Sequence, residues 1–177
     1  MKVILHICCG VCAAGAADML LSEGHRVTGY FYNPNVHPQE EYVLRLDAAR
    51  RTSEKLGFDL VEGPYDPENW LSSTAGFAEE PEGGQRCLIC YQLRMEKTCS
   101  FMRKTGADAF TSTLTISPHK SAEAINRIGN ALGGNSYMAS DFKKKDGFKK
   151  AVDRAKGWGI YRQRYCGCIY SLKGVDK

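Results

Sequence analysis

The stretch Cys8-Cys9-Gly10-Val11-Cys12 constrains the fold of this chain more than any other. Residues 2–7 before it are apolar and partly β-branched, which predicts a buried strand. Residues 11–22 after it are rich in alanine and predict a helix, with Gly10 making the turn. The cysteines would then lie at a strand's carboxyl end and a helix start, where open α/β sheets bind ligands. A helix N-terminus also stabilises thiolates, so this cluster predicts a chemical site rather than small buried side chains.

The rest of the chain alternates predicted strands and helices. Further strands are expected at 27–32, 58–63, 108–114 and 137–140, and helices at 39–56, 85–104, 121–132 and 146–157. Together with the first strand this gives five strands, mostly parallel and joined by right-handed crossovers. We therefore predict a three-layer α/β fold with a mostly parallel, five-stranded, Rossmann-like sheet. The first turn lacks the glycine-rich pattern of dinucleotide and triphosphate sites, which disfavours a nucleoside-triphosphate enzyme.

Two segments depart from this alternation. Residues 64–105 predict a helical insertion that carries Cys87-Leu88-Ile89-Cys90, and residues 141–177 a basic C-terminal segment that carries Cys166-Gly167-Cys168. The length of 177 residues suits a single α/β domain over residues 1–177. There is no apolar run of about 18 residues that could span a bilayer, and the N-terminus lacks a signal-peptide pattern. We expect a cytoplasmic protein that does not bind membranes.

Eight cysteines are too many for routine packing in a reducing cytoplasm, where metal or redox roles are favoured over disulfides. Two adjacent thiolates cannot easily bind one tetrahedral zinc ion, but they can bind different irons of a cubane. A CxxC at a helix start places both of its sulfurs on one side of the first turn. The residues that favour a [4Fe–4S] cluster over zinc are Cys8, Cys9, Cys87 and Cys90.

The last cysteine pair has a different spacing. Cys166 and Cys168, with one glycine between them, predict either a strained, readily reduced disulfide or ligands of one further metal ion. Asp141 follows a predicted short strand and is a candidate hard ligand for iron, although a helix cap or a loop would also suit it. Cys99 is expected to pack in a helix, and Cys12 has no assigned role.

Charge is distributed unevenly along the chain. Residues 141–177 carry 11 Lys and Arg against 4 Asp, whereas residues 1–140 carry 13 basic against 16 acidic residues. A basic end predicts a polyanionic partner, most commonly nucleic acid, with a solvated lysine-rich surface as the alternative. Polar residues near strand ends are candidates for substrate binding, although several also suit turns or caps. They are Asn33, Asn35, His37, Ser117, His119, Lys120, Lys143 and Lys144.

Several motifs in this order together resemble the QueH-type epoxyqueuosine reductase family. They are Leu5-His6-Ile7-Cys8-Cys9-Gly10-Val11-Cys12, Phe31-Tyr32-Asn33-Pro34-Asn35 with His37-Pro38, Arg86-Cys87-Leu88-Ile89-Cys90-Tyr91, Thr111-Ser112-Thr113-Leu114, Ser140-Asp141-Phe142-Lys143-Lys144 and Tyr165-Cys166-Gly167-Cys168. They span nearly the whole chain, which makes the match far more specific than a single CxxC. The chain departs from the family at Val11, where many members carry proline.

The resemblance implies a nucleotide α-hydrolase-like α/β fold and an oxidoreductase that converts epoxyqueuosine to queuosine at the tRNA wobble position. It implies a [4Fe–4S] cluster, a tRNA substrate and an external electron donor. Carried over by position, the cluster ligands would be Cys8, Cys9, Cys87 and Cys90. Cys166 and Cys168 would be a redox pair or would bind an additional iron together with Asp141. Two other functions stay open, a non-catalytic zinc-binding module for tRNA or protein and a thiol-based tRNA sulfur-transfer protein.

Overall fold

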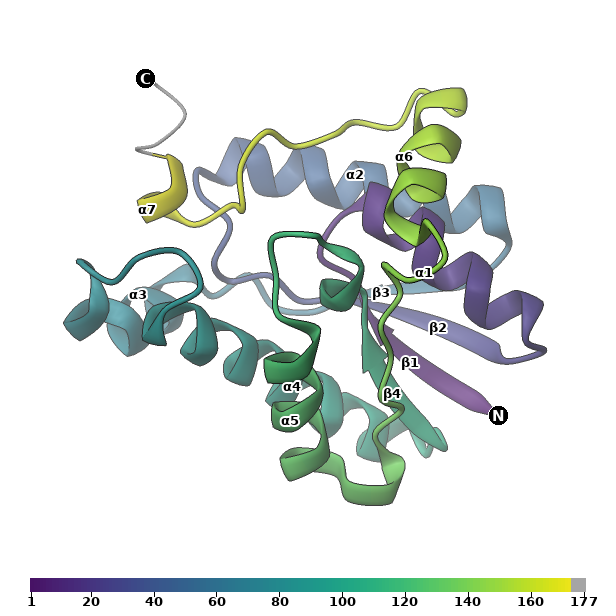
Figure 1. Ribbon diagram of the computed structural model, residues 1–177, viewed down its shortest axis with the longest axis horizontal. Helices are drawn as coiled ribbons and strands as arrows, with labels where there is room; N and C mark the ends of the chain where they lie inside the picture. The colour runs from purple at the N-terminus through teal and green to yellow at the C-terminus, as the bar shows by residue number, and fades with distance from the viewer. Residues whose placement is uncertain (173–177) are drawn as a thin grey trace.

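Four parallel strands form the central sheet (Figure 1). They are β1 Lys2–His6, β2 Arg26–Phe31, β3 Asp59–Glu62 and β4 Ala109–Ser112, in the order β3-β2-β1-β4. This computed structural model describes residues 1–172, so residues 173–177 of the predicted basic segment lie outside the described part. Since β1 and β2 adjoin at the centre, loops from both meet at the carboxyl edge of the sheet.

Helices cover both faces of the sheet (Figure 1). One face carries α1 Gly10–Ser22, α2 Gln39–Leu56 and α6 Gly147–Gly157, and the other carries α4 Gln85–Thr105 and α5 Ala122–Gly133. The short helices α3 Pro67–Thr74 and α7 Ile169–Leu172 lie near each other, and the segment after α6 crosses the molecule to reach α7. The predicted three-layer α/β fold is confirmed. In residues 1–172, no helix is both long and apolar enough to cross a membrane.

The sheet has four strands instead of the predicted five. At the fifth position only an isolated bridge forms, between Phe110 and Tyr137, with the Met138 amide donating to the Phe110 carbonyl at 2.9 Å. The pairing stops there because Asn126 of α5 binds both backbone groups of Ser140, at 3.2 and 2.9 Å. The backbone N–H and C=O groups of Ser140 are therefore not available for hydrogen bonds to β4.

The fourth predicted strand, residues 108–114, also ends earlier than expected. β4 stops at Ser112, whose hydroxyl accepts a hydrogen bond from the Leu114 amide at 3.1 Å. Such local side-chain bonds compete with strand pairing, and here one caps a short 3₁₀ helix, Thr113–Ile116. This turn carries Thr113 toward the loop that follows β1.

β1 is buried on both faces, which explains its nearly continuous apolar sequence. Leu5 faces α1 and α2, whereas Ile4 faces the side of α4. His6 is fully buried at the end of the strand, with Nε2 3.0 Å from the Tyr32 carbonyl and Nδ1 3.0 Å from the Ser112 hydroxyl. Because a carbonyl only accepts, Nε2 carries the proton. Burial and then the nearby Arg94 charge lower the pKa of His6 to about 4, so the ring is neutral.

Glycines let α1 pack closely against both neighbouring helices. Gly10 is the first residue of α1, and a Cβ there would lie 2.6 Å from the Ala48 carbonyl oxygen of α2. Its role is therefore close helix approach, and the expectation that it supplies a special turn conformation is corrected. At Gly15, a Cβ would lie 2.7 Å from the Ala151 Cβ of α6.

Gly15→Ala is expected to lower the free energy of unfolding by about 1–3 kcal/mol through overpacking, although alanine has the higher helix propensity. Chemical denaturation would measure the loss. The control is Gly157→Ala, because a Cβ at Gly157 meets nothing within 4 Å and should leave stability unchanged or raise it. Equal stability of the Gly15 variant and the parent would contradict the tight α1–α6 contact.

Candidate functional site at the carboxyl edge of the sheet

The loop after β1 is tied to the neighbouring strands on both sides. The Cys8 amide donates to Thr113 Oγ1 at 3.1 Å, in the turn after β4. The Asn33 side-chain amide donates to the Ile7 carbonyl at 2.9 Å, from the loop after β2. These bonds fix the cysteine loop at the carboxyl edge of the sheet, where the sequence places it.

Three sulfurs form a compact group in this loop. The Sγ atoms of Cys8, Cys9 and Cys12 all lie within 4.8 Å of one another, and those of Cys8 and Cys9 are 3.9 Å apart. Cys9 caps α1, since its sulfur accepts from the Cys12 amide at 3.3 Å and from Gln163 Nε2 at 3.0 Å. Thiol groups in this arrangement could hold one metal ion or one corner of a cluster.

Cys8 is the cysteine of this group that ionises most readily. Hydrogen bonds from Cys12 and Cys9, and a further one from Thr113 Oγ1 at 3.2 Å, hold the pKa of Cys8 well below its ordinary value. The hydrogen bonds that Cys12 gives to Cys8 and Cys9, together with burial, raise the pKa of Cys12 well above its ordinary value. Cys8 is therefore the member of the group that most favours the thiolate form, and metal binding would release protons from the group.

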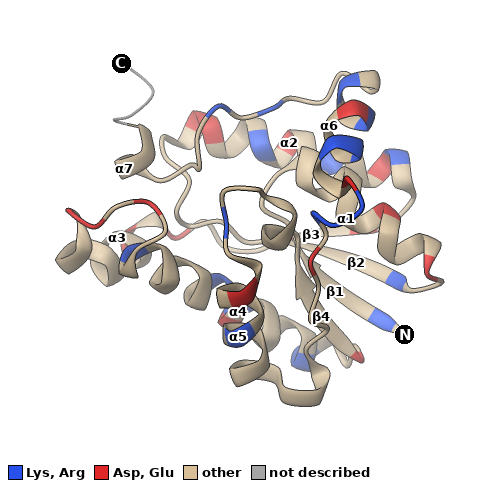
Figure 2. Cartoon of the chain, in the orientation of Figure 1, with Lys and Arg blue, Asp and Glu red and all other residues tan. Residues whose placement is uncertain are grey.

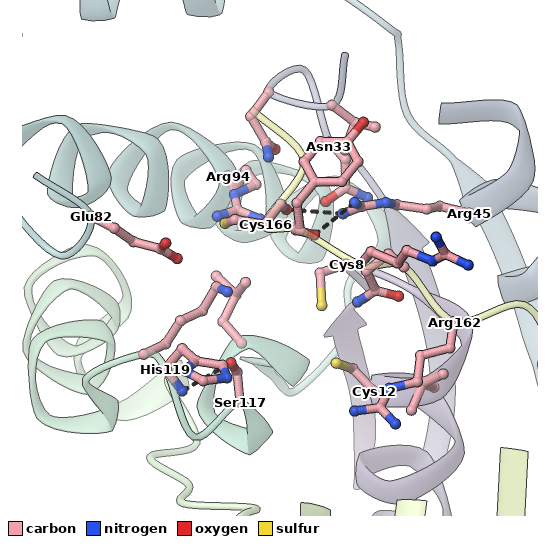
Figure 3. A pocket seen from close by; sticks show the side chains of 18 of the residues that line it. Cys8, Cys12, Asn33, Arg45, Glu82, Arg94, Ser117, His119, Arg162 and Cys166 are labelled. Carbon is pink, nitrogen blue, oxygen red and sulfur yellow. Dashed lines mark hydrogen bonds between the residues drawn. The ribbon is translucent and has the colours of Figure 1, made fainter. Parts of the chain in front are cut away.

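A cavity of about 320 Å³ opens above the sulfurs (Figure 3). Cys8 and Cys12 line one side of it, and Asn33 and Asn35 line it from the loop after β2. The charged and polar side chains that complete the lining include Arg45, Glu82, Arg94, Ser117, His119, Lys120, Arg162, Gln163 and Arg164. Because cations outnumber the single carboxylate, the cavity favours anionic groups.

Arg94 places a buried positive charge on the wall of this cavity (Figure 3). Arg94 is only 2% exposed, and its Nε donates to the Cys90 carbonyl at 3.2 Å. Its Nη2 is buried and has no hydrogen-bond partner among the described residues. A buried cation needs a compensating negative charge. Cysteine thiolates, free or bound to iron, supply that charge, so the donor set and its surroundings fit an anionic iron–sulfur group.

Cys87 and Cys90 lie at the start of α4, as predicted. The Cys87 sulfur accepts from the Gly83 amide at 3.3 Å, and Cys87 and Cys8 pack against the same apolar cluster. Cys90 is buried with Trp70 and Cys168. Burial raises the pKa of both helix cysteines. One cysteine of each predicted pair, Cys8 and Cys87, thus borders the same apolar cluster, whereas Cys87 and Cys90 are not part of the compact sulfur group.

A second cavity, of about 410 Å³, adjoins the first through Cys166 and Glu82, which line both. Cys87 and Cys168 also line it. All eight cysteines are free thiols, so Cys166 and Cys168 are not joined to each other. The last cysteine pair therefore lies between the first cavity and the α4 cysteines.

A buried ion pair on α2 holds Cys166 in place. Arg45 Nε lies 2.7 Å from Glu41 Oε1, and its two Nη atoms donate to the Cys166 and Tyr165 carbonyls at 2.9 and 3.0 Å. Gly167 adopts φ +119°, and a Cβ there would lie 2.7 Å from Arg45 Nη1. The predicted need for glycine between the two cysteines is thus explained by both backbone conformation and space.

The structure brings some predicted residues into the first cavity and leaves others outside it. Those that line it are Cys8, Cys166, Asn33, Asn35, Ser117, His119 and Lys120. His37 instead packs its ring against Trp70, with centroids 5.8 Å apart. Among the described residues Asp141 lines neither cavity, although its Oδ1 is buried without a partner. Lys143 reaches the rim, where Nζ donates to the Lys120 carbonyl at 2.9 Å, and Lys144 is exposed.

Sequence reasoning missed several residues of the site. Arg94 follows Cys90 by four residues and so shares its helix face, a signal that was available. Arg45 follows Glu41 by the same interval, but nothing in the sequence marks that pair as buried. Gln163 carries no recognisable signal, because only the fold brings it to Cys9. Cys99, by contrast, packs in the core beside Met95 and Met102 as expected.

Comparisons with known proteins agree with these features. A family profile described as "Epoxyqueuosine reductase QueH" matches residues 3–174. A protein of that name from Haemophilus influenzae is 36% identical over 180 residues, covering 99% of this chain and 74% of the relative. One from Streptococcus pyogenes is 37% identical over 186 residues, covering 99% and 72%. One from Thermotoga maritima is 32% identical over 178 residues, covering 96% and 90%.

Proposed function

This chain belongs to the epoxyqueuosine reductase QueH family, and from that membership we propose that it reduces epoxyqueuosine to queuosine at the wobble position of tRNA in the cytoplasm. The observation that carries the proposal is the cationic cavity at the sheet edge, lined by cysteines from two separate parts of the chain. A redox site beside a pocket for an anionic substrate is what this reaction needs.

The reaction removes the epoxide oxygen and leaves an alkene, with two electrons and two protons consumed and one water released. We propose that Cys8, Cys9, Cys87 and Cys90 hold a [4Fe–4S] cluster, which would supply electrons one at a time. Arg94 supports this assignment because its buried charge balances the thiolates. Cys12 is the competing fourth ligand, since its sulfur lies within 4.8 Å of those of Cys8 and Cys9.

The chain's own side chains have two further tasks in this scheme. Cys166 and Cys168 provide a second redox element next to the cluster ligands, or hold an additional iron together with Asp141. Asp141 has a buried, unpartnered Oδ1, but it lines neither cavity, and among the described residues it forms no metal-sized group with Cys166 and Cys168. His119 and Lys120 line the cavity and offer N–H groups to the departing oxygen. The electrons come from an external donor.

Lys and Arg positions occur on α6 and on the segment after it (Figure 2), which favours tRNA binding there. Arg162 and Arg164 are exposed on the segment between α6 and α7 and also line the cavity. Exposed lysines continue this surface over the start of α6, at positions 144, 145, 149 and 150. Arg154 is not part of it, since it pairs with Asp18 at 2.7 Å. The tRNA backbone would then lie over the C-terminal segment, with the wobble base in the cavity.

Replacing lysines of this surface by alanine is expected to weaken tRNA binding at low salt. The set to test is Lys143, Lys144, Lys145, Lys149 and Lys150. Each lost phosphate contact should reduce the slope of log K against log salt by about 0.7 to 0.9. Filter binding at several salt concentrations measures both quantities. The control is Lys104→Ala, because Lys104 is exposed in the last turn of α4, at the end of this helix opposite to Cys87 and Cys90. Unchanged affinity across the set would mean that these lysines form a merely solvated surface.

The proposed function is tested with anaerobically purified protein. We expect about four irons and as many acid-labile sulfides per chain. With tRNA that contains epoxyqueuosine and a chemical reductant, nucleoside mass spectrometry should show loss of one oxygen. Stoichiometric zinc without labile sulfide, and no such loss, would support a zinc-binding module. Gain of sulfur by the tRNA would support a sulfur-transfer protein.

A further inference from the structure

Three residues that line the first cavity have side-chain amide oxygens that are buried and have no hydrogen-bond partner among the described residues. The oxygens are Asn33 Oδ1, Asn35 Oδ1 and Gln163 Oε1. Asn33 and Asn35 are each 1% exposed. A buried acceptor without a partner costs about 1–3 kcal/mol, and folded proteins contain few of them. Three such oxygens, all on residues that line one cavity, indicate a ligand that donates hydrogen bonds to them.

The surrounding contacts fix two of these oxygens, those of Asn33 and Gln163, as acceptors. Asn33 Nδ2 donates to the Ile7 carbonyl at 2.9 Å, so its oxygen is the free end of that amide. Gln163 Nε2 lies 3.0 Å from the Cys9 sulfur, which leaves Oε1 free. The loop of Asn35 is held by the Tyr65 hydroxyl, which donates to the Val36 carbonyl at 2.7 Å. The subsite is therefore built before the ligand arrives.

The chemistry of these atoms selects the group that binds them. A phosphate presents only acceptors to such a site, so it cannot satisfy amide oxygens. Phosphates would instead meet the cations of the cavity and its rim, such as Lys120 and Arg162. Hydroxyl and N–H groups are the donors that amide oxygens accept from. The ligand thus carries donors at its inner end and anionic groups outside.

We propose that Asn33, Asn35 and Gln163 form a specificity subsite that binds the hydroxyl and N–H donors of the hypermodified base. This inference rests on the proposed function and adds which part of the substrate the subsite recognises. A guanine without the modification lacks those donors at that position. The subsite would then make the protein prefer a modified wobble base over an unmodified one, independently of the phosphate contacts.

The test compares two anticodon stem–loops of one sequence, one bearing epoxyqueuosine and the other guanine, binding to the anaerobically purified holoprotein. Asn35→Leu keeps the side-chain size and removes the free oxygen. We expect its dissociation constant for the modified stem–loop to rise at least tenfold and that for the guanine stem–loop to stay unchanged. Its thermal midpoint should stay equal or increase, because an unpartnered acceptor is removed. If Asn35 were needed only for folding, its replacement would lower the thermal midpoint.

Gln163→Met is the second variant, and it carries the test if Asn35→Leu does not fold. Asn130→Leu, on the exposed face of α5, is the control and should change neither constant. Two results would overturn the subsite alone, provided that the parent protein reduces the modified base. One is that a variant binds both stem–loops more weakly to the same extent. The other is that a variant keeps the parent's preference for the modified stem–loop. If the parent protein neither prefers the modified stem–loop nor reduces it, the proposed function fails and the subsite fails with it.

Discussion

Cys8→Ala is expected to remove most of the bound iron and to abolish reduction of epoxyqueuosine. Cys8 belongs to both candidate ligand sets, the one predicted from sequence spacing and the compact group with Cys9 and Cys12. Its pKa is held well below the ordinary value by hydrogen bonds, so it is ready to bind metal as a thiolate. It also lines the cavity where the substrate would bind, whereas Cys9 is buried beneath it.

The loss is measured as visible absorption and iron content after anaerobic purification, followed by turnover with modified tRNA. Cys99→Ala is the matched control. Its sulfur packs in the core 3.6 Å from the Leu132 carbonyl, so its loss should leave the iron in place. A Cys8→Ala protein with full iron content would exclude this loop from the metal site.

The same assay decides between Cys12 and the α4 cysteines. If the ligands are Cys8, Cys9, Cys87 and Cys90, then Cys87→Ala should lose iron and Cys12→Ala should keep it. If the compact group is the metal site, the result should be the reverse. Cys12 is assigned no role from the sequence alone, although Cys9-Gly10-Val11-Cys12 is itself a CxxC at a helix start, and the structure brings its sulfur within 4.8 Å of those of Cys8 and Cys9.

The fold was predictable wherever the local pattern and the tertiary contacts agree. The helix predicted over residues 39–56 is α2, Gln39–Leu56, and Gly57 caps its end in the left-handed conformation. It was predictable because the apolar spacing marks the helix and the glycine marks its end. The strand expected at 137–140 failed because the side chain of Asn126 takes its backbone partners. Composition gives no sign of such a long-range side-chain bond.

The candidate site was predictable at the level of residue type and less so at the level of geometry. Cysteine spacing predicted which elements would meet, since carboxyl ends of parallel strands share one edge. The buried charges Arg45 and Arg94 were missed for different reasons. Glu41 and Arg45, four residues apart, also suit a solvent-exposed ion pair, whereas the same interval between Cys90 and Arg94 was a signal that was not used. Their burial depends on how the C-terminal segment and α4 lie across that edge, which sequence periodicity does not encode.

Replacing both Cys166 and Cys168 by Ser is expected to abolish turnover while leaving the cluster spectrum nearly intact. Both residues lie outside the four predicted cluster ligands, so their loss should not remove the cluster. Cys166 lines both cavities, and the buried Arg45 holds its carbonyl at 2.9 Å. If Cys166 is the proposed redox element, its sulfur would exchange electrons with the substrate and the cluster from this position, so its loss should stop the reaction.

The two versions of this role differ at Asp141. If the cysteine pair holds a second iron, Asp141→Ala should lower iron content by about one atom, because a carboxylate suits iron in a mixed oxygen and sulfur site. If the pair is a dithiol and disulfide couple, iron content should stay constant, and alkylating reagents should modify both sulfurs only after reduction. Full turnover by the double-Ser protein would reject both versions. The buried contacts of Cys168 with Trp70 would then be its whole contribution, as packing between α7 and α3.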